Sequence, residues 1–457
     1  MTADTYDLIV IGAGPTGENV ADRAVRGGLS AVIVESELVG GECSYWACMP
    51  SKALLRPVGV VAEASAMRGV TGARLDAAEA LKRRDSFAHD WSDDGQVSWL
   101  ESAKIDLVRG HGRLTGERTV SVGDVTLTAR HAVCLATGTG AVVPPVLAGV
   151  SPWTSREATS AKAVPSRLAI VGGGVVGCEM AAAWSAFGSQ VTLISRGGLL
   201  DRLPTFAGEA VAAGLRDAGV DVRLGVNVSS AVRSGAGVTL TLDDGTSVTC
   251  DEVLSAIGRY PKTRDIGLST VGLSDGSWLS VDDTMRVADV PGGWLYAAGD
   301  VNHLALLTHM GKYQARVCGD AIAARAAGRE PSVRDMASAT RVPQVVFTVP
   351  EVAAVGVTAQ EAIASGMRVR VVEYAIGDVA GASLFADGYQ GQAQMVVDED
   401  RSVIVGLTLV GPGVGEMIHA ATIAVVGEVP LRTLWHAVPS YPTMSELWLR
   451  LLEAYGL

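Results

Sequence analysis

Short apolar runs, glycine clusters and amphipathic stretches alternate along the first half of the chain. Residues 6–11 form an apolar run that leads into Gly-Ala-Gly-Pro-Thr-Gly, a helical pattern to Arg26 and a second run at 31–34. The same order recurs where the run 168–171 leads into Gly-Gly-Gly-Val-Val-Gly, a helical pattern and the run 191–194. Strand, glycine turn, helix and strand in this order make a βαβ unit. The pattern therefore predicts two such units in an α/β fold.

The rest of the pattern predicts a mixture of elements. Residues 58–105 are expected to be helical with charged faces, and 106–136 to form short strands. After the second βαβ unit, strands alternate with turns to about Gly258. The run 294–300 is expected to be a strand that ends on a glycine-aspartate turn and opens a helix. From about residue 336 onward we expect strands and two helices, closed by a final amphipathic helix.

Length and charge limit the classes of protein to consider. A chain of 457 residues is too long for one domain and predicts two to four. The formal net charge of −12 repels nucleic-acid phosphates, so nucleic acid is not expected as a partner. No run reaches the ~18 unbroken apolar residues of a spanning helix, so a membrane is not expected either. The acidic N-terminus has neither the basic region nor the cleavage site of a signal peptide, which predicts a cytoplasmic protein.

The first glycine cluster has the context of a dinucleotide-binding turn. Gly12, Gly14 and Gly17 follow a predicted strand and open a predicted helix, and Glu35 lies at the end of the next strand. Glycines at this spacing allow the turn, let the backbone approach a pyrophosphate and let helix and strand pack closely, while the carboxylate can bind a ribose. The alternative is a glycine-rich turn that binds nothing.

The second glycine cluster has the same context but a different ending. The strand after it ends on Ser195, where a carboxylate is expected, and Arg196 and Arg202 follow. Loss of the carboxylate removes repulsion of a 2′-phosphate, and two guanidinium groups can bind one, which favours NADPH over NADH. The alternative is that both arginines are merely solvated residues of a surface turn. The glycines of this second cluster are Gly172, Gly174 and Gly177.

Two of the six cysteines lie close together in the sequence. Cys43 and Cys48 follow a glycine pair at the start of a helical segment, where thiols have a lowered pKa that suits redox exchange. In an ideal helix these positions are about 8–9 Å apart, beyond the ~7 Å limit for a disulfide, so a bridge requires a distorted helix start. Two unbridged cysteines are the alternative. The remaining cysteines have apolar contexts and are expected to be buried and inert: Cys134, Cys178, Cys250 and Cys318.

The segment Gly41-Glu-Cys-Ser-Tyr-Trp-Ala-Cys-Met-Pro-Ser-Lys52 resembles the redox-active segment of the flavoprotein disulfide reductases, the family of lipoamide dehydrogenase, glutathione reductase and mercuric reductase. The resemblance covers essentially the whole chain. Further matching motifs are Ala136-Thr137-Gly138, Ala256-Ile-Gly258-Arg259, Ala298-Gly-Asp300 and Pro442-Thr-Met-Ser-Glu446.

The resemblance implies a domain organisation and a quaternary structure. It implies two Rossmann-like dinucleotide-binding domains, for FAD and for NAD(P)H, followed by a C-terminal α+β dimerisation domain. It also implies a homodimer, in which the apolar runs 342–349 and 447–452 are buried between chains, although these runs could instead pack within one chain. The expected domains are 1–150 with 276–335 for FAD, 151–275 for NAD(P)H and 336–457 for dimerisation.

The resemblance also implies roles for individual residues. Cys48 would face the flavin as the charge-transfer thiol, and Cys43 would be the interchange thiol that meets the substrate. Lys52 and Glu179 resemble the ion pair beside flavin N5, and Asp300 resembles the ligand of the FAD ribitol or phosphate. Further residues implied at the cofactors are Gly41, Thr137, Gly138, Gly258 and His309, and no metal ligands are expected.

The resemblance carries a mixed signal about the nicotinamide cofactor. Arg196 and Arg202 fall on the two positions that bind the 2′-phosphate in glutathione reductases, which favours NADPH. Gly177 is more similar to the NAD enzymes of the family, so NADH stays possible.

One departure from the family bears on the substrate. Disulfide-reducing members carry a histidine, supplied by the partner subunit as acid and base, five residues before the glutamate that matches Glu446; Tyr441 occupies that position here. His436 could reach the site only if its loop doubled back. A phenol with a pKa near 10 is a poor base, though it can donate a proton. Mercuric reductases also place tyrosine here but rely on a C-terminal cysteine pair that this sequence does not carry, so mercury reduction is not expected.

Three functional interpretations remain open at this point. The leading one is an FAD enzyme that takes hydride from NADPH and passes electrons through Cys43 and Cys48 to a small-molecule acceptor needing no strong protein base, such as a quinone, a metal ion or a reactive disulfide. The second is a disulfide reductase in which His436 or Tyr441 replaces the histidine. The third is a flavin-bound redox sensor or a subunit of a larger complex.

Overall fold

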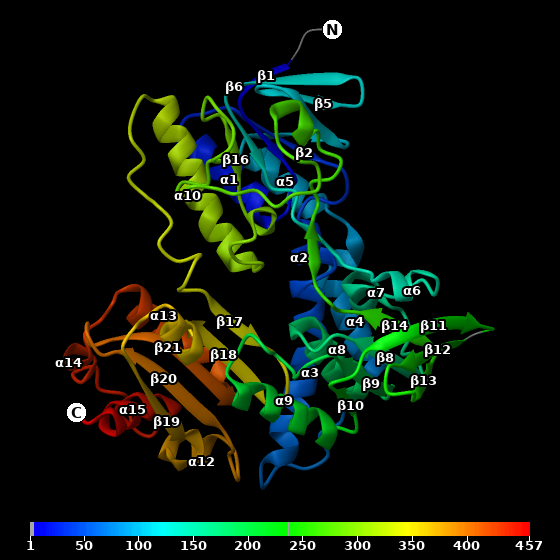
Figure 1. The fold of residues 1–457 in the computed structure, drawn as a ribbon, viewed down its shortest axis with the longest axis vertical. Coiled ribbons are helices and arrows are strands. Elements are labelled where there is room, and N and C mark those ends of the chain that lie inside the picture. Colours follow the sequence, from blue (N-terminus) through cyan, green and yellow to red (C-terminus); the bar gives the residue numbers. More distant parts are fainter. Residues whose placement is uncertain (1–3, 236) are drawn as a thin grey trace. The chain divides into compact units, whose positions relative to one another are not determined.

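A computed structural model describes residues 4–235 and 237–457 of the chain, which divides into two compact units (Figure 1). The first unit comprises Met1–Pro50, Asp85–Ala141 and Arg259–Ala339. The second unit comprises Ser51–Arg84, Val142–Gly258 and Thr340–Leu457.

The first unit is built on a seven-stranded sheet. The strand β1 (Asp4–Ile11) lies between β2 (Ala31–Glu35) and β6 (Val125–Leu135) and runs parallel to both. The strands predicted at 6–11 and 31–34 are therefore present. The remaining strands are β3 (Ile105–Arg109) beside β2, β16 (Leu295–Ala297) beside β6, the antiparallel pair β4 (Gly112–Gly116) and β5 (Thr119–Val122), and a separate pair, β7 (Thr139–Ala141) with β15 (Arg259–Pro261).

Both faces of this sheet are buried. Along β1, Leu8 and Val10 pack into one apolar cluster, and Ile9 and Ile11 pack into another. All four side chains are buried, as expected for a parallel sheet covered on each face. The near-continuous apolar run of the sequence follows from this two-sided burial.

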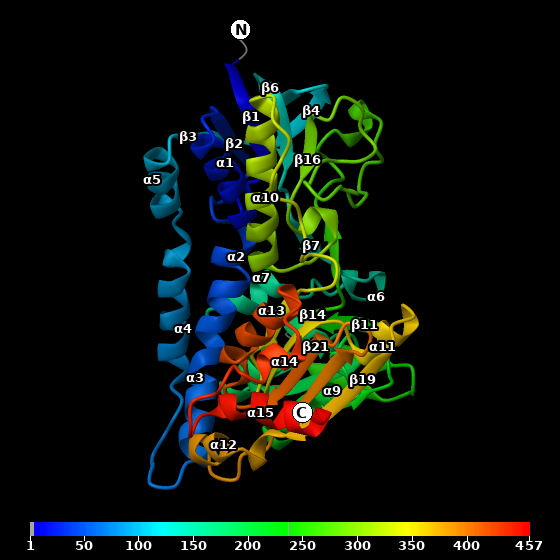
Figure 2. The same ribbon diagram turned by 90° about the vertical axis from the view of Figure 1, so that its left-hand side faces the viewer.

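Two helices of the first unit, α1 (Pro15–Arg26) and α10 (Thr308–Ala326), lie side by side (Figure 2). Gly319 permits the close approach, because a Cβ there would overlap the side chain of Arg23. The helix expected to open at the glycine-aspartate turn begins later, at Thr308. The turn itself is a short 3-10 helix (Asp300–Asn302), which ends at His303, whose left-handed φ of 61° interrupts a helical path.

The stretch expected to be helical between 58 and 105 contains three α-helices separated by loops. They are α3 (Cys48–Ala66), α4 (Ala77–Phe87) and α5 (Asp94–Ser102), with a short 3-10 turn at His89–Trp91. A shorter helix, α2 (Gly41–Tyr45), precedes α3.

The second unit contains a second parallel sheet, in the order β10-β9-β8-β14. The strand β8 (Arg167–Val171), the helix α8 (Val175–Ala186) and the strand β9 (Gln190–Ser195) form the second predicted βαβ unit. The other elements are β10 (Asp221–Leu224), β14 (Glu252–Ser255), the antiparallel strands β11 (Val228–Ser234), β12 (Gly237–Leu242) and β13 (Ser247–Cys250), and the short helices α6 (Pro145–Ala148) and α7 (Ser155–Ser160).

One helix of the second unit differs from the sequence expectation. Only strands and turns were expected between the second βαβ unit and Gly258, yet α9 (Thr205–Asp217) is a 13-residue helix. Gly208 and Gly214 lie inside it and weaken its helical signal. Both are needed for packing, because a Cβ would overlap the carbonyl oxygens of Leu199 and Val349, respectively.

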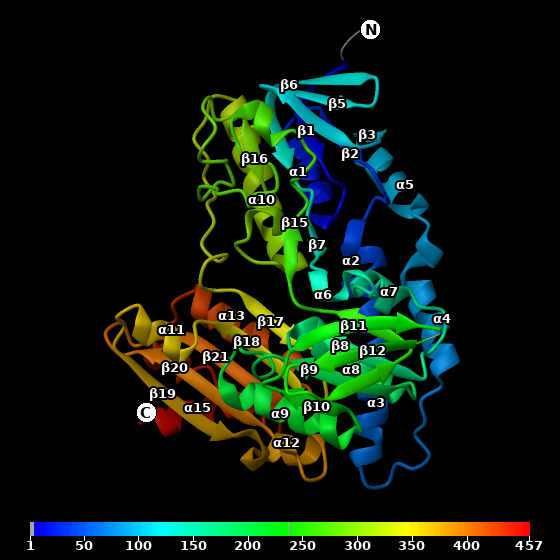
Figure 3. The same ribbon diagram turned by 45° about the vertical axis from the view of Figure 1, so that its right-hand side comes forward.

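The C-terminal part of the second unit is a five-stranded antiparallel sheet, in the order β17-β18-β21-β20-β19 (Figure 3). More helices accompany it than the two expected before the closing helix, because several are too short to show a helical period. The strands are β17 (Pro343–Val346), β18 (Glu351–Gly356), β19 (Val369–Ala375), β20 (Gln392–Asp398) and β21 (Val403–Gly411). The helices are α11 (Ala359–Ala364), α12 (Ala380–Phe385), α13 (Ile418–Val426), α14 (Leu431–Leu434) and the closing helix α15 (Leu447–Tyr455).

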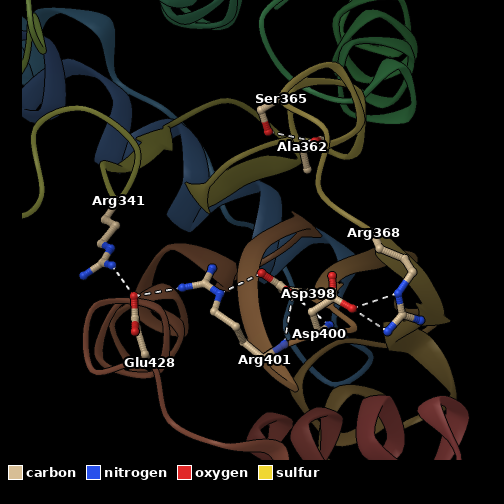
Figure 4. A network of polar contacts seen from close by, with 8 residues as sticks. All are labelled: Arg341, Ala362, Ser365, Arg368, Asp398, Asp400, Arg401 and Glu428. Atoms are coloured by element: carbon tan, nitrogen blue, oxygen red, sulfur yellow. Dashed lines mark hydrogen bonds and ion pairs between the residues drawn. The ribbon is translucent and has the colours of Figure 1, made fainter.

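A charged network ties the ends of these C-terminal elements together (Figure 4). Arg401 donates to Asp398 at 2.7 Å and to Glu428 at 3.1 Å, and Arg341 donates to the same oxygen of Glu428. Asp398 is buried at the end of β20, so its carboxylate is paired rather than left alone in the sheet.

Candidate cofactor and dithiol sites

The first glycine turn joins β1 to α1. Gly12 has φ +105°, and a Cβ there would overlap the carbonyl oxygen of Ala136. Gly17 packs in the same way against Gly12, whereas a Cβ on Gly14 would meet nothing within 4 Å. Gly12 and Gly17 are therefore required by the protein's own packing. Gly14 instead leaves open space at the start of α1, where a helix N-terminus favours a phosphate.

This open space belongs to a cavity whose walls carry the predicted FAD residues. The predicted FAD residues that line this cavity are Gly12, Gly14, Glu35, Gly41, Thr137, Gly138 and Asp300. Both oxygens of Glu35 accept backbone N–H groups, from Ala13 and Glu37, each at 2.7 Å. The carboxylate is thus held in place at the end of β2, with lone pairs left for a ribose.

Two further polar groups in the cavity fit a bound dinucleotide. The hydroxyl oxygen of Thr137 is buried and has no hydrogen-bond partner among the described residues. Asp300 accepts a hydrogen bond from Thr139 at 2.7 Å, and burial raises the pKa of its carboxyl. A buried orphan hydroxyl and a glycine cradle that a Cβ would fill are features that a ligand with ribose and phosphate groups would satisfy. The residues present therefore fit FAD.

The dithiol lies where the helix is broken. α2 ends at Tyr45, Trp46 has a non-helical φ of −138°, and α3 begins at Cys48. This break brings the two thiols close together, and Cys43 is hydrogen-bonded to Cys48. Such proximity requires a distorted helix start, and the structure contains one.

The surroundings of the two thiols differ. The Cys48 sulfur lies 3.2 Å from the Thr308 hydroxyl at the start of α10, and Cys43 lines the cavity. The hydrogen bond to Cys48 and burial raise the pKa of Cys43, while Thr308 and the Lys312 ammonium oppose the rise. The other four cysteines are buried, as expected, and burial raises the pKa of Cys178 to about 12.

The second glycine turn joins β8 to α8 in the second unit. Gly172 has φ +124°, and a Cβ there would overlap the carbonyl oxygen of Ala256. Gly177 packs against Gly172, and a Cβ on Gly174 would again meet nothing within 4 Å. The two turns are thus alike in geometry, and the second also has open space at a helix N-terminus. Gly258, two residues after Ala256, has φ +135°, a conformation that favours glycine.

The residues after β9 present two cations to solvent. Ser195 is buried, and its hydroxyl donates to the carbonyl of Gly198 at 2.9 Å. Arg196 and Arg202 are exposed, and neither guanidinium has a partner within the described ranges. The Ser195 hydroxyl therefore stabilises the turn that it belongs to, and both arginines are available to a ligand.

The predicted ion pair is present in the second unit. Lys52 on α3 donates to Glu179 on α8 at 2.7 Å. Glu179 is 3% exposed, and its other oxygen accepts the backbone N–H of Phe347 at 3.1 Å. The Lys52 ammonium also lies 5.0 Å from the centre of the Phe347 ring. Both members of the pair are thus fixed in place.

Tyr441, which occupies the position of the family histidine, lies in a segment that is exposed to solvent. Tyr441 is 77% exposed, and His436 is exposed in the turn after α14. Glu446 is buried and accepts a hydrogen bond from Arg450. The structure does not bring His436 to Glu446. His309 is exposed at the start of α10, next to Thr308.

Several residues near these sites were not singled out from the sequence. Thr308 contacts Cys48, and Lys262 on the cavity wall pairs with Glu42 at 3.2 Å. Glu18 and Lys312 line a second cavity in the same unit. No local pattern singles out these residues, because each depends on contacts between segments that lie far apart in the sequence.

Two glycine turns of dinucleotide-binding type, together with a dithiol at a broken helix start, define a flavin- and nicotinamide-dependent oxidoreductase. The chain belongs to the pyridine nucleotide-disulphide oxidoreductase family, whose model matches residues 6–328. The dimerisation domain of that family matches residues 342–451. The sequence-based family assignment and the α/β fold are confirmed, and the chain is an oxidoreductase of the FAD and NAD(P)H class. Within the described residues, no helix is long and apolar enough to cross a membrane.

Proteins of known name resemble the chain over its full length. Dihydrolipoyl dehydrogenase 3 of Pseudomonas aeruginosa is 33% identical, over 97% of this chain and 96% of that protein. Dihydrolipoyl dehydrogenase of Thermus scotoductus is 32% identical, over 98% and 97%. LpdA from Mycobacterium tuberculosis has a TM-score of 0.84 at 24% identity, covering 100% of both chains. The HOCl-induced flavoprotein disulfide reductase RclA from Escherichia coli has a TM-score of 0.85 at 23% identity, covering 98% and 99%.

Proposed function

We propose that this chain takes hydride from NADPH and passes two electrons, through FAD and the Cys43–Cys48 pair, to a small acceptor that needs no strong protein base. We expect quinones and metal ions to be better electron acceptors than disulfides. The observation that carries this preference is the exposed phenol of Tyr441 where disulfide-reducing members carry a histidine. A phenol is a poor base at neutral pH, so acceptors that depend on assisted thiol deprotonation are disfavoured.

The residues of the first unit would hold the flavin cofactor. The N-terminus of α1 and the space at Gly14 would bind the pyrophosphate, Glu35 would bind a ribose, and Asp300 would bind the ribitol or phosphate. FAD, when bound, supplies the capacity to accept a hydride and release electrons in pairs. Cys48, fixed against Thr308, would be the thiol that faces it, and Cys43 would meet the acceptor.

The residues of the second unit would hold the nicotinamide nucleotide. The turn at Gly174 would bind its pyrophosphate. Arg196 and Arg202, both exposed and unpaired among the described residues, would bind a 2′-phosphate, which favours NADPH. A pyridine nucleotide of one kind or the other is expected from family membership.

A disulfide reductase is the second candidate function. It is favoured by the names of the relatives that are 33% and 32% identical, which are dihydrolipoyl dehydrogenases. In this case Tyr441 or His436 would have to protonate the leaving thiolate. The exposure of both side chains leaves them accessible to a partner chain.

We also propose that the chain is a homodimer, since its C-terminal part matches the dimerisation domain of the family. The runs 342–349 and 447–452 would lie between the two chains of the dimer. The boundaries of the three domains stay predictions. Sedimentation should give twice the mass of the chain at micromolar concentration, and a monomer would contradict the proposal.

Acceptor profiling of the purified, FAD-loaded protein tests the function. With NADPH as donor, we expect quinones or metal ions to be reduced faster than glutathione disulfide, lipoamide or mycothiol disulfide. Fast turnover of one of these disulfides would favour the second candidate instead. Negligible turnover with every acceptor would contradict both.

A further inference from the structure

The segment that carries Cys43 is anchored on the first glycine turn. The backbone N–H of Gly40 donates to the carbonyl oxygen of Ala13 at 2.7 Å. Gly41, the first residue of α2, packs on Gly14 so closely that a Cβ would overlap the Gly14 Cα. Glu42, the next residue, lines the same cavity as Gly14. The start of α2 therefore holds a carboxylate close to the space that a diphosphate would occupy.

The wall of this cavity carries more negative than positive groups. Besides His111, four acidic and two basic side chains line it among the described residues. The acidic residues are Glu35, Glu37, Glu42 and Asp300, and the basic residues are Arg259 and Lys262. A diphosphate brings further negative charge, and like charges repel more strongly in a partly buried cavity than in water. The charge balance of the wall therefore bears on how tightly the cofactor is held.

Lys262 pairs with the Glu42 carboxylate from a segment far away in the sequence. The backbone N–H of Lys262 donates to the carbonyl oxygen of Gly138 at 3.0 Å, directly after the pairing of β15 with β7. Its ammonium donates to Glu42 Oε1 at 3.2 Å, across 220 residues of chain. The side chain of Lys262 is 36% exposed and that of Glu42 is 22% exposed. The pair is thus partly shielded from water, where charges act more strongly on each other than at an open surface.

A second pair of opposite charges lies on the same wall. Arg259 lies 3.9 Å from Asp300, and the hydroxyl of Thr139 accepts a hydrogen bond from Arg259 and donates one to Asp300. Burial raises the pKa of Asp300, the Thr139 hydrogen bond and Arg259 oppose the rise, and the charge of Glu42 adds to it. Glu42 and Asp300 are therefore close enough to repel each other, and each is paired with a cation.

We propose that Lys262 allows the cavity to hold FAD tightly, because its ammonium neutralises the Glu42 carboxylate beside the diphosphate of the cofactor. The inference rests on the proposed place of the diphosphate at Gly14. Without the ammonium, the Glu42 carboxylate would repel the diphosphate. Lys262 is thus a positioning residue that acts through Glu42, and its effect is on the binding of the cofactor.

A purely structural ion pair is the alternative, since Lys262 also ties the segment after β15 to α2. In that case the loss of either partner would weaken FAD binding in the same way. Neutralisation of charge predicts opposite effects instead. Removal of the ammonium leaves a carboxylate that repels the diphosphate, whereas removal of the carboxylate leaves a cation that attracts it. The sign of the change in FAD affinity therefore separates the two explanations.

FAD release from the holoenzyme tests the proposal. The FAD-loaded protein is diluted in steps, and the fluorescence of the released flavin gives the dissociation constant, while circular dichroism at saturating FAD checks the fold. Lys262→Met should raise the dissociation constant at least about tenfold, because it leaves a partly buried carboxylate without its cation. Glu42→Gln should lower the dissociation constant. The double variant Lys262→Met, Glu42→Gln should bind FAD about as tightly as the unmutated protein.

Three further measurements separate charge from other effects. Lys262→Arg keeps the cation and should keep the FAD affinity. Added salt should reduce the effect of Lys262→Met, because it screens the repulsion between the carboxylate and the diphosphate. The matched control Lys82→Met breaks an exposed pair with Glu79, which joins the two side chains at 2.7 Å outside the cavity, and should leave the dissociation constant unchanged.

The possible failures are distinguishable. If Gly14→Val keeps its FAD, the proposed place of the diphosphate is wrong. If Gly14→Val loses FAD but Lys262→Met binds it as tightly as the unmutated protein does, only the role of Lys262 is wrong. Glu42→Gln decides the matter even if Lys262→Met does not fold, because a variant that binds FAD no more tightly than the unmutated protein would overturn the inference.

Discussion

Arg450 lies in the C-terminal helix, one turn after Glu446, and its guanidinium donates a hydrogen bond to the Glu446 carboxylate at 2.5 Å. The second oxygen of Glu446 is buried and has no partner among the described residues. The carboxylate is therefore committed to a guanidinium of its own chain. The segment before it presents a phenol, Tyr441, to solvent.

Tyr441→Phe tests whether that phenol takes part in turnover. If the acceptor is a quinone or a dye, the phenol proton is not consumed, and we expect the rate to change only slightly. If the chain reduces a disulfide, removal of Tyr441 or His436 should lower the rate on the order of 10²–10⁴, because the leaving thiolate loses its proton donor. Steady-state rates of Tyr441→Phe and His436→Ala with both acceptor classes decide between these outcomes.

Gly14→Val separates cofactor binding from folding. A side chain there meets no protein atom within 4 Å but enters the space proposed for the pyrophosphate, so the variant should fold and lose most of its FAD. Gly12→Val should instead fail to fold, because Gly12 has φ +105° and no room for a Cβ. Flavin absorbance per chain and circular dichroism measure the two effects.

Gly149→Val is the matched control for this pair. Gly149 also has free space around it but lies outside the cavity, so the variant should retain both flavin and fold. Full FAD occupancy in Gly14→Val would show that the pyrophosphate lies elsewhere.

Local patterns were sufficient to predict the βαβ units. The strands at 6–11 and 31–34 and the glycine turns follow from apolar runs and glycine spacing within about 30 residues of chain. The pairing of Lys52 with Glu179 was expected from family resemblance alone, since 127 residues separate them. The redox-active segment was recognised in the same way.

Features that depend on packing were missed. The helix α9 contains Gly208 and Gly214, whose helix-weakening effect is offset by close backbone contacts that the sequence does not show. The position of Glu18 in a cavity depends equally on contacts between α1 and α10, whose sequences lie far apart. A local pattern carries no information about either.

The double variant Arg196→Ala, Arg202→Ala tests the preference for NADPH. Each charge-assisted contact to a 2′-phosphate is worth about 1.5–3 kcal/mol, so the apparent affinity for NADPH should fall at least about tenfold while that for NADH changes little. Arg216→Ala removes an exposed arginine of α9 and serves as the control. Equal efficiency of the two nucleotides in the unmutated enzyme would count against the assignment.

Asp398→Asn should make the C-terminal sheet less stable, and the effect should depend on pH. The hydrogen bond from Arg401 holds the pKa of Asp398 below its usual range, so its stabilising effect is present above the unfolded-state pKa and is lost as the pH falls. At pH 7 we expect the free energy of unfolding to decrease by about 1–3 kcal/mol. Hydrogen exchange of β20 and β21 at several pH values measures the change.

Asp400→Asn is the control for this prediction. Asp400 pairs with Arg368 at the surface, where an ion pair contributes little, so its loss should change protection only slightly (Figure 4). A pH-independent effect of Asp398→Asn would show that packing, and not the charge, is responsible.

The two cysteines should have different spectroscopic effects in the FAD-loaded protein. Anaerobic reduction with NADPH should produce a long-wavelength charge-transfer band from the Cys48 thiolate, and Cys48→Ser should abolish it. Cys43→Ser should show the band without reduction, because Cys48 can then form no bridge. Cys250→Ser, which replaces a buried thiol in the second unit, should behave as the unmutated protein does. If neither Cys43→Ser nor Cys48→Ser alters the spectrum, the two cysteines have a structural role and the acceptor receives its electrons by another route.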